Sequence, residues 1–282
     1  MQRGKGKIME AIAVIGLGII GGSICATLSQ KGKVVYGYDL DETVVEKALE
    51  KGYIVGKAED FSAFDMVFVA VPASATISIL DSAKFKDGAL VMDICGIKKS
   101  IETVVYSKPR NYKYVGLHPM AGKETSGLDS ATDKLFRGAN LVVTIAEKTD
   151  SKSLERVVCL AQELEFGNIV RCTADEHDKK ISLTSQLAHL VSNAYVKSSE
   201  VVGCEPFTGG SFQDMTRIAG VDEKMWTQLY LLNAENIVVE LDALIAHLQE
   251  YRSAIANADK EELSALLKAG RIIREKIKRK NS

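Results

Sequence analysis

Hydrophobic residues are grouped in two different ways along this chain of 282 residues. In the first half, short apolar runs rich in β-branched residues alternate with stretches of helical character. Runs that are apolar on both faces, separated by helices, are typical of a parallel sheet covered on both sides. The predicted strands are 11–16, 33–39, 66–71, 89–94, 112–117 and 140–145, and the predicted helices between them are 20–31, 41–51, 73–84 and 98–107.

After about residue 172 no further β run is evident, and the pattern is helical to the end of the sequence. Thr173 followed by Glu176 matches a capping box, which predicts a helix from there to about residue 202. Further helices are predicted over 222–232, 233–258 and 260–279. We therefore expect a flexible extension over 1–9, an α/β domain over 10–172 and an all-α domain over 173–282.

The helix over 233–258 has apolar residues at alternating spacings of four and three. This is a heptad pattern, which suits either a helical bundle within the chain or the interface of a dimer. The pattern alone does not decide between the two. The residues are Ile237, Leu241, Leu244, Leu248, Tyr251 and Ile255.

The composition, 46% hydrophobic and 26% charged with 4 prolines, is that of a soluble globular protein. A formal net charge of -1 predicts no general attraction to nucleic acid or to an anionic membrane. The 5 cysteines form no C-x-x-C pair and have no zinc-ligand spacing, so we expect reduced thiols in a cytoplasmic protein and no metal site. Residues 11–28 resemble the apolar core of a signal peptide, but four glycines and the strand that follows argue against one.

A glycine-rich motif lies between the first predicted strand and the first predicted helix. In the G-x-G-x-x-G pattern of residues 16–21, Gly16 permits a tight turn, Gly18 lets the backbone approach a pyrophosphate and Gly21 allows close packing of helix on strand. Asp39 follows Gly21 by 18 residues, where a carboxylate binds an adenosine ribose and repels the 2′-phosphate of NADP. The first domain is therefore predicted to be a Rossmann-type domain that binds NAD. Its expected cofactor residues are Gly16, Leu17, Gly18, Ile19, Ile20, Gly21, Asp39 and Val71.

His118 follows directly from the fifth predicted strand, in the stretch GLHPMAGKETSG. This position lies near the carboxyl edge of the sheet, where ligands of open α/β folds bind. A histidine beside a nicotinamide can accept the proton of a hydroxyl group as the carbon loses hydride. The residues alone favour this catalytic role over that of a structural histidine, without excluding the latter.

One face of the helix that starts at Thr173 carries uncharged polar groups almost throughout. Such a face suits either a ligand cavity or a buried polar network, and we expect a cavity. Its residues are Asp178, Ser182, Ser185, Gln186, His189, Ser192 and Asn193. Beyond it, the Gly209-Gly210 pair allows a loop to pass close to a ligand, and Arg217 offers a planar fork for a carboxylate or, equally, for a surface salt bridge.

Four motifs occur in this order: GLGIIGGS, HPMAGKETSG, TSQLAHLVSNAYV and GGSFQDMTRIA. With them the chain resembles the prephenate dehydrogenase family over nearly its whole length, from about residue 10 to 260. The resemblance implies NAD-dependent oxidation and decarboxylation of prephenate to 4-hydroxyphenylpyruvate in tyrosine biosynthesis. It also implies that the helical domain binds substrate and forms a homodimer, which favours a role between subunits for the heptad pattern.

The resemblance also assigns roles to single residues. His118 would be the catalytic histidine, and Arg217 would bind a substrate carboxylate. Glu124 would help to order the loop, while Asp214 and Trp226 would lie near the entrance of the site. The expected substrate-binding residues are His189, Arg217, Glu124, Gly96, Gly210, Gln213, Asp214 and Trp226.

Two positions depart from the family pattern. Gly96 stands where the family often has a serine that bonds the histidine, so that a water or Cys95 would have to replace its hydroxyl group. Gln213 stands where some members have lysine, which leaves an arogenate dehydrogenase or a dual-specificity cyclohexadienyl dehydrogenase as alternatives. A β-hydroxyacid dehydrogenase and an inactive NAD-binding sensor are further alternatives. Because the helical domain uses the rest of the chain, any inhibition by tyrosine is expected at the active site.

Overall fold

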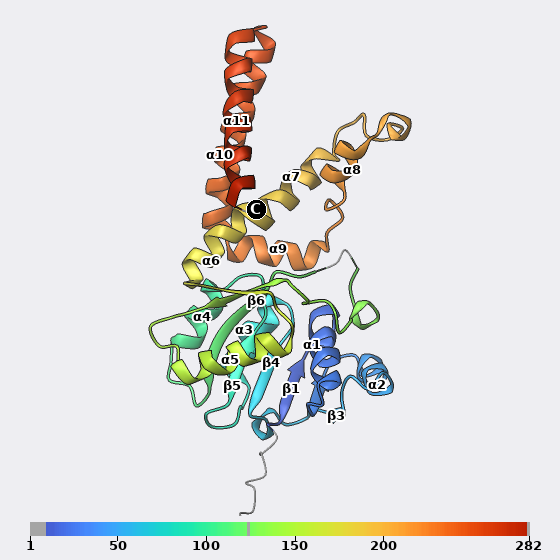
Figure 1. The fold of residues 1–282 in the computed structure, drawn as a ribbon, viewed down its shortest axis with the longest axis vertical. Helices are drawn as coiled ribbons and strands as arrows, with labels where there is room; N and C mark the ends of the chain where they lie inside the picture. Colours follow the sequence, from blue (N-terminus) through green and yellow to red (C-terminus); the bar gives the residue numbers. More distant parts are fainter. Residues whose placement is uncertain (1–9, 123–124, 281–282) are drawn as a thin grey trace, which may run out of the picture. The chain divides into compact units, whose positions relative to one another are not determined.

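The computed structural model describes residues 10–122 and 125–280. The chain divides into two compact units, of which the first ends at Asn233 and the second begins at Ala234. The predicted extension over 1–9 and Glu124 lie outside the described residues. The first unit begins with a region of alternating strands and helices (Figure 1). Its elements are β1 (Ile12–Ile15), α1 (Ile19–Gln30), β2 (Val35–Tyr38), α2 (Glu42–Glu50), β3 (Gly56–Lys57), η1 (Phe61–Ala63), β4 (Met66–Val69), α3 (Ala73–Ser82), β5 (Leu90–Asp93), α4 (Lys99–Tyr106), β6 (Lys113–Pro119), η2 (Leu128–Ser130), β7 (Asn140–Thr144), α5 (Ser151–Glu163) and β8 (Asn168–Cys172).

The strands form one sheet of eight strands in the order β3-β2-β1-β4-β5-β6-β7-β8. All six strands predicted from the sequence are present, but β3, β8 and the helix α5 were not predicted. The sheet is also not entirely parallel, because β7 runs antiparallel to β6 and pairs His118 with Val142. With its helices on both faces, the sheet confirms the predicted α/β class.

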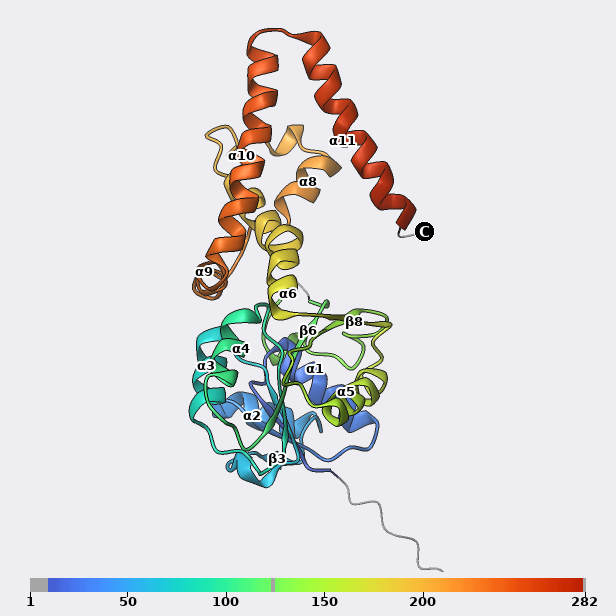
Figure 2. The same cartoon turned by 90° about the vertical axis from the view of Figure 1, so that its left-hand side faces the viewer.

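The core lies on both faces of the sheet, because successive residues of a strand point to opposite sides. In β1, Ile12 and Val14 belong to one apolar cluster, and Ala13 and Ile15 belong to the other. The first cluster includes residues of α1, α2 and α5, and the second includes residues of α3 and α4. Figure 2 shows α1 and α5 on one side of the sheet and α3 and α4 on the other. The central strands β1, β4 and β5 are therefore buried on both faces, as their unbroken apolar runs predict.

After the sheet, the first unit continues entirely as helices, which confirms the predicted change of class. The predicted helix from Thr173 does form, and the Thr173 hydroxyl accepts a hydrogen bond from the Glu176 amide at 3.1 Å. It ends at Tyr195 rather than near residue 202, and its middle turns are a π-helix. The elements are α6 (Ala174–Ile181), the π-helix η3 (Ser182–Leu187), α7 (Ala188–Tyr195), η4 (Glu205–Phe207), α8 (Gly210–Thr216) and α9 (Glu223–Leu232).

The second unit consists of two long helices, α10 (Ala234–Ala256) and α11 (Lys260–Lys280), which form a hairpin (Figure 2). The Tyr251 hydroxyl of α10 donates to the Leu266 carbonyl of α11 at 3.2 Å. The predicted heptad residues Leu248 and Ile255 are nevertheless 56% and 63% exposed. Other large apolar side chains of this unit are also exposed, among them Val239, Leu267 and Ile273. The hairpin therefore leaves much apolar surface uncovered.

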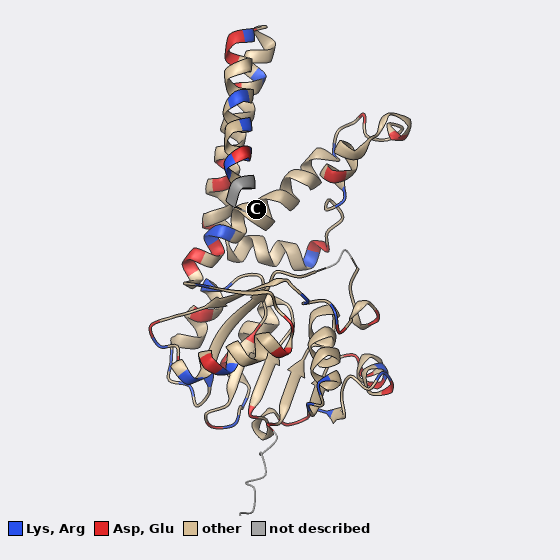
Figure 3. Ribbon diagram, viewed as in Figure 1, with Lys and Arg blue, Asp and Glu red and all other residues tan. Residues whose placement is uncertain are grey.

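Charges of both signs are mixed along the chain (Figure 3). Helices such as α2, α5 and α6 carry side chains of both signs, whereas α1 and α7 carry no lysine, arginine, aspartate or glutamate. No helix within residues 10–122 and 125–280 is both long and apolar enough to cross a membrane.

Candidate active site

The glycine motif adopts the geometry that its sequence predicts. Gly16 has φ +91°, and a Cβ atom there would lie 2.4 Å from the Ala70 carbonyl oxygen. A Cβ atom at Gly21 would lie within 1.9 Å of the Gly16 carbonyl oxygen. At Gly18, by contrast, a Cβ atom would meet nothing within 4 Å. Two glycines therefore close the turn, and the third leaves open space at the amino end of α1, where a pyrophosphate would bind.

Asp39 and Val71 border this turn. One Asp39 carboxylate oxygen accepts the Leu17 amide at 2.8 Å, and the other accepts the Asp41 amide at 3.1 Å. These bonds fix the carboxylate at the end of β2 while leaving lone pairs for ribose hydroxyl groups. Val71 lies at the other side of the turn, where its Cγ1 atom would be 2.7 Å from a Cβ atom on Gly16. The structure thus gathers the predicted cofactor residues around one loop.

His118 is the second-last residue of the strand β6, which ends at Pro119, and its side chain is half-buried. Its Nδ1 atom is 2.8 Å from Nε2 of His177, a residue of α6. Burial lowers the pKa of the His118 imidazole well below its ordinary value, and the nearby His177 and Lys98 lower it further. The ring is therefore neutral at neutral pH, which is the form that can accept a proton.

His177 is in turn bonded to the residue that follows it in α6. Its Nδ1 atom is 2.7 Å from an Asp178 carboxylate oxygen, and both side chains are buried. The same carboxylate accepts the backbone amides of Lys98 and Lys99 at 2.8 and 2.9 Å, at the amino end of α4. Two side chains, those of Asp178 and His177, therefore connect the start of α4 to the ring of His118.

A second buried network supports the loop between β5 and α4. The Lys98 ammonium contacts an Asp93 carboxylate oxygen at 2.5 Å, and both side chains are fully buried. The other Asp93 oxygen accepts the Tyr114 hydroxyl at 2.6 Å. Breaking such a buried pair would leave an uncompensated charge. Lys98 thus holds the loop to the sheet with its side chain and to α6 with its backbone.

Gly96, in the middle of this loop, lies beside the reactive ring. A Cβ atom at Gly96 would be 3.7 Å from both Cε1 and Nε2 of His118 and 4.0 Å from Leu229 of α9. Cys95 does not fill the place of the missing serine. Its thiol contacts Thr76 and the Val71 carbonyl, and burial raises its pKa to about 12. The thiol is therefore a core group without acid–base function.

His189 and Trp226 stack on one another, with ring centroids 4.1 Å apart. The Nδ1 atom of His189 bonds the Ser185 carbonyl at 2.9 Å, and Trp226 also contacts Tyr230. Because α9 carries Trp226 as well as Leu229, it connects this aromatic stack to the loop of Gly96. The structure thus links the two predicted substrate residues to the neighbourhood of His118.

The polar face of the helix α6–η3–α7 corrects our expectation of a cavity. Gln186 donates to the Leu229 carbonyl and accepts from Asn233, while Ser192 donates to the Met215 carbonyl and Asn193 to the Ala219 carbonyl. These groups satisfy backbone atoms of α8, α9 and their flanking loops. Most of the polar face is therefore the buried network that the sequence left as the alternative.

The remaining predicted substrate residues belong to α8 and its ends. Gly210 is the first residue of this helix, Gln213 and Asp214 lie within it, and Arg217 follows it directly. All of them are exposed. The hydrogen bonds of Ser192 and Asn193 hold this segment to α7. Glu124, the predicted loop acid, lies outside the described residues.

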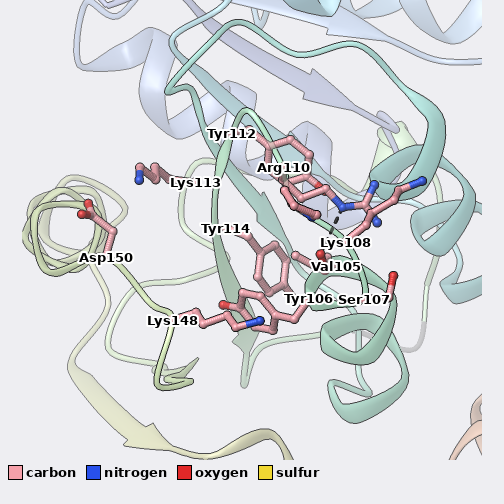
Figure 4. Close-up of a pocket in the computed structure, with 11 residues that line it drawn as sticks. Val105, Tyr106, Ser107, Lys108, Arg110, Tyr112, Lys113, Tyr114, Lys148 and Asp150 are labelled. Atoms are coloured by element: carbon pink, nitrogen blue, oxygen red, sulfur yellow. Dashed lines mark hydrogen bonds between the residues drawn. The ribbon is translucent and has the colours of Figure 1, made fainter.

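A cavity of about 340 Å³ lies elsewhere, at the amino end of β6 (Figure 4). Three of its cations have structural partners: Arg110 binds Asp81 and the carbonyls at the end of α4, Lys108 also binds Asp81, and Lys148 lies over the Tyr106 ring. His118 lies at the opposite end of β6. This cavity is therefore not part of the candidate site.

The sequence pattern did not predict a role for His177, for the buried pair of Asp93 and Lys98, or for Asp178 as the partner of His177. His177 and Asp178 are adjacent in the motif EHD, four and five residues after Thr173. A histidine next to an acid near the start of a helix was the available signal. What joins it to His118 is a contact across 59 residues of sequence.

Comparisons with known proteins show the family of the chain. Residues 24–168 match the model of the prephenate dehydrogenase nucleotide-binding domain, and residues 173–269 match that of the prephenate dehydrogenase dimerization domain. The chain is 31% identical over 282 residues to a prephenate dehydrogenase of Lactococcus lactis, covering 95% of this chain and 77% of that protein. It is 29% identical over 272 residues to a cyclohexadienyl dehydrogenase of Zymomonas mobilis, covering 91% and 92%.

A solved structure of prephenate dehydrogenase from Aquifex aeolicus, in complex with hydroxyphenyl propionate and NAD+, superposes with a TM-score of 0.83 at 28% identity. The alignment covers 97% of this chain and 100% of that one. Both halves of the molecule, the nucleotide-binding sheet and the helices after it, are included in the match. The chain belongs to the prephenate dehydrogenase family.

Proposed function

We propose that this protein is an NAD-dependent dehydrogenase that oxidises prephenate and releases carbon dioxide, forming 4-hydroxyphenylpyruvate. The observation that carries the proposal is a neutral, half-buried His118 next to the end of a strand in a sheet whose first turn fits a dinucleotide. Family membership supports the same reaction. NAD, once bound at the glycine turn, would accept the hydride.

The residues of the chain would divide the remaining work. Gly18 leaves the space for the pyrophosphate, and Asp39 would bind the ribose hydroxyl groups and disfavour a 2′-phosphate. His118 would accept the proton of the substrate hydroxyl while the carbon loses hydride. Loss of the ring carboxylate then produces an aromatic ring, which makes the overall step strongly downhill.

Substrate binding is assigned to the helices after the sheet. Arg217 would pair with a substrate carboxylate, and the stacked rings of His189 and Trp226 would contact the substrate beside Gly96. Asp214 would lie near the entrance with Trp226, Gly210 and Gln213 would be further substrate residues, and Glu124 would help to order the loop after His118. A water next to Gly96 would take the place of the missing serine hydroxyl, since Cys95 is turned toward Thr76.

We also propose a division of the chain near residue 172 and a homodimer formed through the later helices. The two matching family models meet between residues 168 and 173, and the second is described as a dimerization domain. The exposed apolar residues of α10 and α11, such as Leu248 and Ile255, support an interface with a second copy. Sedimentation velocity of the purified protein tests this, since a monomer at micromolar concentration would contradict it.

A specific observation favours arogenate as a second candidate substrate. Gln213 is neutral where a lysine would repel the ammonium group of arogenate, and one relative of the chain is named a cyclohexadienyl dehydrogenase. Tyrosine, which is the product of that reaction, would then compete at the active site.

The deciding experiment measures NADH formation with prephenate and with arogenate, each supplied with NAD or NADP. Turnover of prephenate with NAD supports the proposal. Turnover of arogenate alone would replace prephenate by the second candidate, and binding of NAD without turnover of either substrate would refute both. The variant His118→Asn, tested in parallel, shows whether any activity arises from this site.

A further inference from the structure

The direction of the hydrogen bonds beneath His118 can be derived from Asp178. Its carboxylate accepts two backbone amides, those of Lys98 and Lys99, at 2.8 and 2.9 Å. Backbone N–H groups can only donate, so the oxygens of Asp178 act as acceptors. The amino end of α4 adds a favourable potential for a negative charge there. One end of the network is therefore fixed as an acceptor.

The protons of the two rings follow from this end. Nδ1 of His177 lies 2.7 Å from an Asp178 oxygen, so it must donate its proton. In its neutral form the His177 ring has one N–H, so that in this form Nε2 is an acceptor. Nδ1 of His118, 2.8 Å away, must then be the donor. The remaining nitrogen of His118, Nε2, has no proton.

Nε2 is also the atom of His118 that faces the open position at Gly96. A Cβ atom built on Gly96 would lie 3.7 Å from it, at ordinary contact distance. A histidine without a partner in water carries its proton mainly on Nε2, which would place a donor rather than a base at this position. The network thus selects the tautomer that presents a lone pair to the space beside Gly96.

We propose that His177, held by Asp178, is a positioning residue that fixes His118 in the Nδ1–H tautomer and so keeps Nε2 available as the base. The catalytic part of this inference rests on the proposed function, whereas the tautomer does not. His177 is 2% exposed and Asp178 is 1% exposed, so water does not compete for these bonds.

A purely structural role for the pair makes a different prediction. Asp178 joins α6 to the amino end of α4 through the Lys98 and Lys99 amides, and the Lys99 ammonium also pairs with Asp175 of α6, so this attachment does not need the His177 ring. If His177 only filled space, an aromatic replacement would preserve both the fold and the state of His118. The two roles are therefore separable by substitution at His177.

The chain contains only 4 histidines, so the ring nitrogens can be assigned by ¹⁵N nuclear magnetic resonance of the whole protein. We expect His118 of the unchanged protein to carry its proton on Nδ1. In His177→Phe the proton is expected to move to Nε2. In His177→Gln, whose amide can both accept from His118 and donate to Asp178, most of the Nδ1–H form is expected to remain. His247→Gln, on the exposed surface of α10, is the matched control.

Kinetics of the same variants provide the second readout. His177→Phe is expected to lower kcat by roughly 10²-fold with little change in KM, because a base in the wrong tautomer loses most of its contribution. His177→Gln is expected to recover most of the loss, which excludes a defect of folding as the cause. Thermal unfolding of each variant confirms that the protein compared is folded.

Two results would overturn the inference: an Nε2–H tautomer of His118 in the unchanged protein, or an unchanged tautomer in His177→Phe. Absence of turnover in every form, with the tautomers as expected, would instead refute the proposed function and leave the tautomer assignment supported. The two failures are thus distinguishable.

Discussion

The two ends of the candidate site are constructed in different ways. At the glycine turn the functional surface is the backbone, and the decisive contacts lie between Gly16, Gly21 and the neighbouring Ala70. At the reaction end the functional group is one side chain, His118, whose state depends on His177 and Asp178 from a helix 59 and 60 residues later in the chain. The first end is local in sequence and the second is not.

This difference teaches where each end is vulnerable. The glycine turn binds the cofactor with its backbone, so it tolerates no added atoms at Gly16 or Gly21, but it needs no residue from a distant part of the sequence. His118 can act as a base only in one tautomer, so it tolerates changes of shape nearby but depends on every donor and acceptor in its hydrogen-bond network. Substitutions should therefore affect cofactor binding and catalysis separately.

The largest effect is expected from His118→Asn. Turnover should fall by roughly two to four powers of ten, as for the loss of a general base, while the affinity for NAD stays the same. Steady-state kinetics and titration with NAD measure the two quantities. Unchanged turnover would show that the reaction end does not depend on this side chain.

The glycine turn can be tested with a matched pair of variants. Gly21→Ala places a methyl group within 1.9 Å of the Gly16 carbonyl oxygen, so we expect the free energy of unfolding to fall by about 1–3 kcal/mol and NAD binding to weaken. Gly18→Ala meets no protein atom within 4 Å and should leave stability unchanged while NAD binding weakens roughly tenfold. Equal stability losses in both variants would contradict the distinct roles assigned to the two glycines.

Arg217→Ala tests the proposed binding of a substrate carboxylate by the residue that follows α8. Loss of a charge-assisted hydrogen bond to a carboxylate should raise KM roughly tenfold, the lower end of the range because Arg217 is exposed. The value of kcat should change little. A loss confined to kcat would mean that Arg217 does not bind the ground-state substrate, and Arg217→Lys is the control that retains the charge without the planar fork.

The pH dependence of kcat/KM tests the state of His118 directly. Burial, His177 and Lys98 lower its pKa below the ordinary value of about 6.5, and only the neutral ring accepts a proton. The rate should therefore stay level as pH falls through 6.5 and decline only at lower pH. A decline that begins above pH 6.5 would show that the ring titrates like an exposed histidine.

The smallest effect is expected from Gly96→Ser. The backbone at Gly96 lies outside the left-handed region, and the new side chain would begin 3.7 Å from Nε2 of His118, so the protein should fold normally. One added neutral hydrogen bond near the ring corresponds to about 1 kcal/mol, or a rise in turnover of roughly fivefold. A large loss of activity would indicate that the space beside Gly96 is already filled by a group the reaction needs.

The sequence predicted the strands of the sheet and the cofactor turn because both depend on neighbouring residues. Unbroken apolar runs indicated β1, β4 and β5, and the spacing of the glycines indicated the turn before α1. It did not predict β8, whose residues are partly exposed at the sheet edge and lack such a run. Nor did it predict the antiparallel direction of β7, which depends on how a long connection returns to β6.

The polar face after Thr173 shows the same limit for the site. Its residue types were visible, but whether they bond a ligand or the backbone of α8 and α9 depends on partners such as Leu229 and Ala219. His177 was overlooked because it lies beside Asp178 rather than on that face. Spacing along one helix cannot report a contact that another element supplies.

The π-helix over Ser182–Leu187 separates His177, bonded to the sheet, from His189, stacked on Trp226. One residue inserted into or deleted from this stretch would turn everything after it by about 100° around the helix axis. Either His177 or His189 would then lose its neighbour, although no side chain had been replaced. The length of this helix between the two histidines should therefore constrain the site independently of which residues occupy it.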